Sequence, residues 1–183
     1  MLWIISGPSS VGKSTFIRSD QCLALTGLGP ETSVLKPKNA PGLDARLLAD
    51  ADCFVHYNIL RPVSLFAKRE ATKATSSREY RERSIRYNDD PWWSEFSART
   101  RNRRAIVMVA NRTAISDRAK ARPDYKNEYW RELYRHLDLT EIYRAWCSEL
   151  ERQKIPFAFV DATGSTYPEL DSNAAFAIIE RGS

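Results

Sequence analysis

The chain lacks a long uninterrupted hydrophobic run, and this absence excludes a membrane-spanning helix. Such a helix needs roughly 18 consecutive apolar residues, whereas the apolar run that starts at Met1 ends at Ile5 and leads into glycine. The same run is too short for the apolar segment of a secretion signal. We therefore expect a cytoplasmic protein with no membrane partner.

Cysteine is also scarce. The 183 residues include three cysteines, at positions 22, 53 and 147, and none of them belongs to a CxxC pair. An odd number of widely spaced cysteines predicts reduced thiols in the cytosol, and it supports neither a disulfide framework nor a zinc site.

The composition that remains is that of a globular protein. Hydrophobic residues make up 43% of the chain and charged residues 28%, which argues against disorder. The length fits a single domain over residues 1–183. The net charge of +5 suits an anionic ligand such as a polyphosphate, and nucleic acid is a less favoured partner.

Short apolar segments rich in β-branched and aromatic residues alternate with longer segments of helical character. This alternation is typical of α/β proteins, so we predict a three-layer αβα sandwich with a five-stranded, mainly parallel sheet. The predicted strands are Leu2 to Ser6, Ser33 to Lys36, Cys53 to Asn58, Ala105 to Ala110 and Phe157 to Val160. The predicted helices are Lys13 to Leu25, Leu43 to Ala49, Ser64 to Tyr87, Trp92 to Arg101, Tyr125 to His136, Leu139 to Gln153 and Ser172 to Glu180.

One part of the chain is dense in charge. The segment KREATKATSSREYRERSIR, at 68–86, contains few large apolar residues, and such runs are usually a solvated face. We expect a charged helical excursion from the domain at about 64–103. The alternative is an arm that reaches over an acceptor molecule.

The strongest motif follows the first predicted strand. The residues GPSSVGKS, at 7–14, fit the phosphate-loop pattern GxxxxGK[ST] without a departure. Glycines let the backbone N–H groups turn inward around phosphates, and the following helix adds the positive end of its dipole. We expect Lys13 to be a solvent-facing catalytic cation that reaches the β- and γ-phosphates, and Ser14 to ligate Mg²⁺. The predicted nucleotide-binding residues are Gly7, Ser9, Ser10, Val11, Gly12, Lys13, Ser14 and Thr15.

The loop GPSSVGKST resembles that of the P-loop nucleoside and nucleotide kinases, and of guanylate kinases in particular. Members of that superfamily are single α/β domains with a five-stranded parallel sheet, so the resemblance implies this architecture, although only residues 2–16 match specifically. It also implies ATP and Mg²⁺ as cofactors. The guanylate-binding motifs TTRxxRxGE and GxDY are absent, which argues against GMP as the acceptor.

Basic residues follow the fourth predicted strand, in the segment ANRTAISDRAKARPDYKNEYW at 110–130. In nucleotide kinases a lid at this position carries arginines that close over the triphosphate. The resemblance therefore implies a lid at about 112–124, in which Arg112 binds the nucleotide and Arg118 and Arg122 are catalytic. The alternative for each of these arginines, and for Lys120, is an ordinary surface role.

Polar residues end the third predicted strand and follow it. Ligands bind at the carboxyl ends of strands in open α/β sheets, so we predict a catalytic role for His56 and acceptor binding by Asn58 and Arg61. The alternative for His56 is a core histidine bonded to a backbone carbonyl.

A carboxylate that would organise Mg²⁺ is missing from its usual position, because only the last predicted strand ends in an acid, Asp161. In nucleotide kinases the loop after that strand lies near the base. We therefore predict that Asp44, after the second strand, orients the acceptor hydroxyl group or a water molecule on the metal ion.

Two rival classes remain to be weighed. A switch GTPase needs the motif NKxD, and the nearest candidate, NRTA at 111–114, lacks both the lysine and the acid. A nucleotide-hydrolysing module that acts on nucleic acid or a partner protein, including a polynucleotide kinase-like enzyme, fits the basic charge but not the small size. The sequence thus favours an ATP-dependent phosphotransferase that transfers the γ-phosphate of Mg-ATP to a small-molecule acceptor, anionic if Arg61 binds it.

Overall fold

The computed structural model describes residues 1–37, 42–49, 51–63, 86–121 and 138–181, which build a six-stranded sheet in the order β2-β3-β1-β4-β5-β6. The first five strands are parallel, and β6 pairs antiparallel with β5. The predicted α/β class with a mainly parallel sheet is confirmed. The strands are β1 (Leu2–Gly7), β2 (Val34–Leu35), β3 (Cys53–Asn58), β4 (Arg103–Val109), β5 (Phe157–Asp161) and β6 (Glu169–Leu170).

The strand β1 lies at the centre of the sheet, between β3 and β4, and all of its residues are buried. Because both faces of a parallel sheet are covered, its central strand is a continuous apolar run and does not alternate. The sixth strand was not predicted, because the two residues of β6 are too few to show a period-2 pattern.

The described helices agree with the predictions except near the phosphate loop and at residues 112–120, where a helix was not predicted. The predicted helix from Lys13 to Leu25 is wrong, since Ser19 divides it: its hydroxyl donates to the carbonyl of Phe16 and accepts from the amide of Cys22. This pair of bonds ends one helix and caps the next. The predicted helix at 125–136 and most of that at 64–87 lie outside the described residues. The helices are α1 (Lys13–Phe16), α2 (Asp20–Thr26), α3 (Ala45–Leu48), the short 3₁₀ helix η1 (Tyr87–Asp89), α6 (Pro91–Arg99), α7 (Arg112–Lys120), α9 (Leu139–Arg152) and α10 (Ser172–Glu180).

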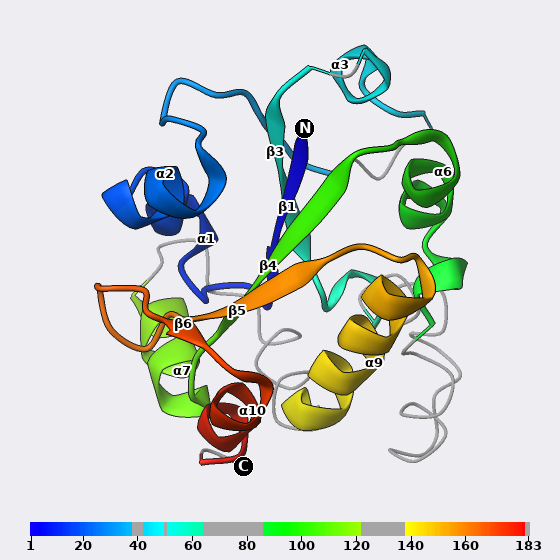
Figure 1. The fold of residues 1–183 in the computed structure, drawn as a ribbon. Coiled ribbons are helices and arrows are strands. Elements are labelled where there is room, and N and C mark those ends of the chain that lie inside the picture. Colours follow the sequence, from blue (N-terminus) through cyan, green and yellow to red (C-terminus); the bar gives the residue numbers. More distant parts are fainter. Residues whose placement is uncertain (38–41, 50, 64–85, 122–137, 182–183) are drawn as a thin grey trace.

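Helices cover both faces of the sheet, which gives the predicted three layers. Figure 1 shows α1 and α2 on one side of the sheet and α6 and α9 on the other. On the α9 side, Trp146 donates its indole N–H to the hydroxyl of Ser6 in β1, at 2.9 Å. Within the part of the chain that the structure describes, no helix has both the length and the apolarity that crossing a bilayer requires.

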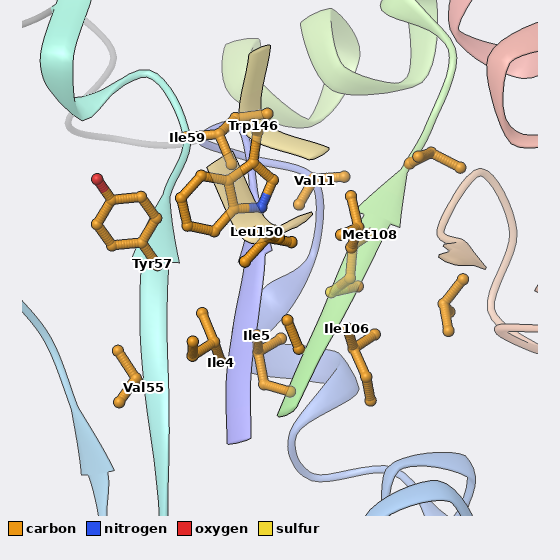
Figure 2. Close-up of a cluster of buried hydrophobic side chains, with 14 of the residues drawn as sticks. Ile4, Ile5, Val11, Val55, Tyr57, Ile59, Ile106, Met108, Trp146 and Leu150 are labelled. Atoms are coloured by element: carbon orange, nitrogen blue, oxygen red, sulfur yellow. The ribbon is translucent and has the colours of Figure 1, made fainter. Parts of the chain in front are cut away.

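A cluster of aromatic side chains fills the space between the sheet and α9. Tyr57 of β3 stacks on Trp146 with 4.8 Å between the ring centroids, and Trp93 of α6 meets the same indole edge-on at 4.7 Å. Figure 2 shows Tyr57 and Trp146 beside the aliphatic side chains of β1 and β4. The second half of the predicted excursion at 64–103 therefore differs from expectation, because α6 packs in the core. Residues 64–85 lie outside the described residues.

The cysteines are free and buried. Burial raises the pKa of the Cys22 and Cys53 thiols to about 11 and that of Cys147 to about 12. Because the thiolate is the reactive form, these side chains act as small apolar groups in the core.

Candidate functional site

The phosphate-loop motif forms a tight turn at the carboxyl end of β1. Gly7 has φ 149° and Gly12 has φ 104°, a region that only glycine adopts readily. A Cβ atom on Gly7 would also lie 2.8 Å from the carbonyl oxygen of Met108. Gly12 begins α1, and no side chain caps this helix end. The glycines are therefore required by the backbone path of the loop.

Other residues of the motif anchor the loop or contact its neighbours. The side chain of Val11 is fully buried and points into the apolar core shown in Figure 2, so this residue can bind a ligand only through its backbone. Ser10, between the two glycines, also has a positive φ, of 65°. Tight turns of this kind can present backbone N–H groups on their concave side, where anions bind.

Lys13 is folded into its own loop. Its Nζ donates to the carbonyl oxygens of Gly7 at 2.8 Å and Pro8 at 2.6 Å, and the residue is 3% exposed. The expectation of a solvent-facing lysine is therefore wrong. The ammonium group lies at the centre of the turn because buried carbonyl oxygens need a donor and the charge needs acceptors.

The end of β3 lies against this loop, as expected from the strand order. His56 Nε2 lies 3.4 Å from the hydroxyl of Ser14, and the amide of Asn58 donates to the hydroxyl of Ser9 at 3.0 Å. Asn58 also accepts from the amide of Leu60 through its Oδ1 atom. The structure thus brings together two of the four residues predicted on the acceptor side.

Arg61 has a different environment from the one predicted. Its Nε donates to a carboxylate oxygen of Asp90 at 2.7 Å, and the Arg61 side chain is only 12% exposed. Asp90 is fully buried and also accepts from the hydroxyl of Tyr57 and the amide of Trp92. The guanidinium group is therefore engaged within the fold, which argues against its use as a fork for an acceptor.

Asp44 does not join the loop. Its carboxylate caps α3 by accepting from the amide of Arg46, and it pairs with the guanidinium group of the same residue at 2.8 Å. Cys53 is the first residue of β3 and Asn58 the last, so at roughly 3.3 Å per residue the two ends of the strand are about 16 Å apart. Figure 1 shows α3 beside the chain's N-terminus, at the amino end of β1 and β3. The predicted role of Asp44 at the acceptor hydroxyl is therefore not compatible with this position.

The predicted lid begins as a helix. Asn111 accepts from the amide of Ala114 and so caps α7, whose residues Ile115 and Ala119 are buried. Arg112 is the first residue of this helix, and Lys120, its last, forms an exposed pair with Asp117. Residues 122–124, which include Arg122, lie outside the described residues.

Arg118 links two loops at the carboxyl edge of the sheet. Its guanidinium group donates to the carbonyl oxygens of Val11 and Thr163, both at 3.0 Å. Thr163 follows β5, and its amide donates to Asp161. Arg118 therefore braces the phosphate loop against the loop after β5.

Two residues at this edge of the sheet were not predicted from the sequence. Asp90 precedes Pro91, a pair typical of a helix start, and this signal was available in the sequence. Thr163 Oγ1 is the single buried side-chain oxygen or nitrogen atom that has no hydrogen-bond partner among the described residues. No pattern in the sequence marks it.

Comparisons with protein-family models, curated proteins and solved structures gave no significant match.

Proposed function

We propose that this protein is an ATP-dependent phosphotransferase that moves the γ-phosphate of Mg-ATP to a small-molecule acceptor. The observation that carries the proposal is the curled loop at 7–14, with glycines of positive φ at positions 7 and 12 and the Lys13 ammonium group at its centre. A tight glycine-containing loop around a lysine ammonium group, at the start of a helix, is suited to a polyphosphate.

The residues around the loop fit the parts of the reaction. The Lys13 ammonium group, 2.6 Å from the carbonyl of Pro8, would turn from its carbonyl partners toward the β- and γ-phosphate oxygens. Ser14 presents the hydroxyl group that would hold the metal ion. A bound divalent cation supplies charge neutralisation between the β- and γ-phosphates.

The proposed phosphoryl transfer involves no change of oxidation state, so it needs no oxidant or reductant. The acceptor oxygen forms a bond to the γ-phosphorus while the bond from that phosphorus to the β,γ-bridging oxygen breaks, and the acceptor's proton leaves to a base or to water. Because the transition state is loose, catalysis depends mainly on position and charge. The brace from Arg118 to Val11 and Thr163 would hold the loop in place for this step.

A transfer assay with γ-³²P-labelled ATP tests the proposal. Panels of nucleosides, sugars, phosphorylated metabolites and oligonucleotides would be offered separately, with ADP formation measured alongside label transfer. We expect label on a small hydroxylated or phosphorylated compound. Transfer or hydrolysis only with oligonucleotides would replace the proposal with the nucleic-acid alternative, and failure to bind ATP with any divalent ion would overturn it.

A further inference from the structure

An imidazole group stands beside the hydroxyl group that would hold the metal ion. His56 Nε2 and Ser14 Oγ are 3.4 Å apart, although the residues are 42 positions apart in the sequence and belong to β3 and α1. The register of the sheet fixes this neighbourhood, since His56 pairs with Ile5 near the end of β1. The two atoms therefore lie close together beside the loop, although they belong to different secondary-structure elements.

Their separation fits two ligands of one metal ion. If each ligand atom lies about 2.1 Å from the ion, a typical distance for imidazole nitrogen, a separation of 3.4 Å corresponds to an angle of about 108° at the ion. That angle is close to tetrahedral and somewhat wider than the right angle between neighbouring ligands of an octahedron. A small movement of either side chain brings it to the octahedral value.

The three acids considered for this site have other contacts. Asp161 accepts from the amide of Thr163, Asp90 pairs with Arg61, and Asp44 caps α3. Among the described residues, no three His, Cys, Asp or Glu side chains gather in a group that could hold a metal ion. An ion at the loop would therefore draw its remaining ligands from phosphate oxygens and water.

We propose that the cation held with the nucleotide is a transition-metal ion such as Mn²⁺ or Co²⁺, bound by His56 Nε2 and Ser14 Oγ, in preference to Mg²⁺. Imidazole suits first-row transition metals, whereas Mg²⁺ favours oxygen ligands. Ligation through Nε2 requires the neutral imidazole with its proton on Nδ1. This inference rests on the proposed nucleotide binding at the same loop, and it replaces the Mg²⁺ of the proposed function with a transition-metal ion.

Calorimetric binding of the ATP analogue with a β,γ-methylene bridge tests the preference, because this analogue is not hydrolysed. We expect wild-type protein to bind it at least about tenfold more tightly with Mn²⁺ than with Mg²⁺. His56→Asp, which supplies an oxygen ligand, should reverse the preference toward Mg²⁺. His136→Gln, a change at the chain's other histidine, should leave it unaltered.

Electron spin-echo spectroscopy of bound Mn²⁺ gives a second readout that does not depend on activity. The wild-type complex should show nitrogen coupling that changes when the protein is labelled with ¹⁵N-histidine, and His56→Gln should abolish it. Equal affinity with Mg²⁺ and Mn²⁺, together with no histidine coupling, would overturn the inference and leave the proposed function standing. Absence of analogue binding with every ion would overturn both.

Discussion

Two consecutive residues of β3, His56 and Tyr57, serve different parts of the molecule. His56 faces α1 and lies 3.4 Å from Ser14, whereas Tyr57 faces the opposite layer and stacks on Trp146. Successive side chains of a strand point to opposite faces of the sheet, so one strand end contributes to the candidate site on one face and to the core on the other. A polar strand end is thus not evidence that every residue in it is functional.

The core side of this comparison contains a buried charge network. Asp90 accepts from Tyr57 and Arg61, and burial, followed by the charge of Asp90, raises the pKa of Tyr57 well above its usual value. Tyr57 is therefore a neutral donor. Arg61, which the sequence suggested as a substrate ligand, belongs to this network and holds the strand end in place.

The largest effect is expected from Lys13→Met, which acts on the loop side of the comparison. If Lys13 neutralises charge on the transferring phosphoryl group, as proposed, its loss should lower turnover by about 10³-fold, equivalent to about 4 kcal/mol. Turnover and thermal melting would be measured together. Lys120→Met, at an exposed lysine in α7, is the control. A folded Lys13→Met variant with wild-type turnover would contradict the assignment.

On the core side, Asp90→Ala should destabilise the protein strongly, because it removes the buried carboxylate that pairs with the Arg61 guanidinium group. Removal of one partner of a buried ion pair typically lowers the free energy of unfolding by about 3–5 kcal/mol. Urea denaturation would measure this loss. Glu95→Ala, which breaks the exposed pair with Arg99 in the same helix, should cost about 1 kcal/mol or less. If Asp90→Ala instead abolished nucleotide binding with no loss of stability, the division between the two faces would be wrong.

Arg118→Ala should have an intermediate effect on nucleotide affinity, because Arg118 holds the phosphate loop from outside and is not part of it. Without the bonds to Val11 and Thr163, the loop must be ordered when the nucleotide binds, and affinity for an ATP analogue should fall by about tenfold, equivalent to about 1.4 kcal/mol. Calorimetry would measure it. Arg144→Ala removes an exposed pair with Glu180 and should leave affinity unchanged. Equal affinities for both variants would show that the brace has no part in binding.

Much of the fold could be predicted from the sequence because it depends on local patterns. The apolar run of β1, the glycines of the loop and the amphipathic helix α9 each leave a signal within a few residues. The division at Ser19 was missed because a serine inside a helical pattern gives no sign of whether it caps or continues the helix.

The site was less predictable because its geometry depends on distant contacts. His56 and Ser14 are neighbours because β3 pairs with β1, the strand that leads into the loop. The burial of Lys13 and the pairing of Arg61 with Asp90 depend on the path that the loops take in space. Residue types and their spacing in the sequence do not specify that path. Asp44 was predicted near the acceptor for lack of the same information, whereas it caps α3 at the amino end of β1 and β3 (Figure 1).

The smallest effect is expected from Asp44→Ala, and it separates the two ends of β3. Loss of the cap on α3 should lower the melting temperature by about 2–4 °C, the usual consequence of removing one cap in a protein of this size. Turnover should not change, because a carboxylate near the start of β3 is too far from the loop for proton transfer. Asp171→Ala, which removes the cap of α10, is the matched control and should give a similar loss of stability. A fall in kcat for Asp44→Ala alone, with no change in ATP affinity, would mean that the segment containing α3 moves to the phosphate loop during the reaction.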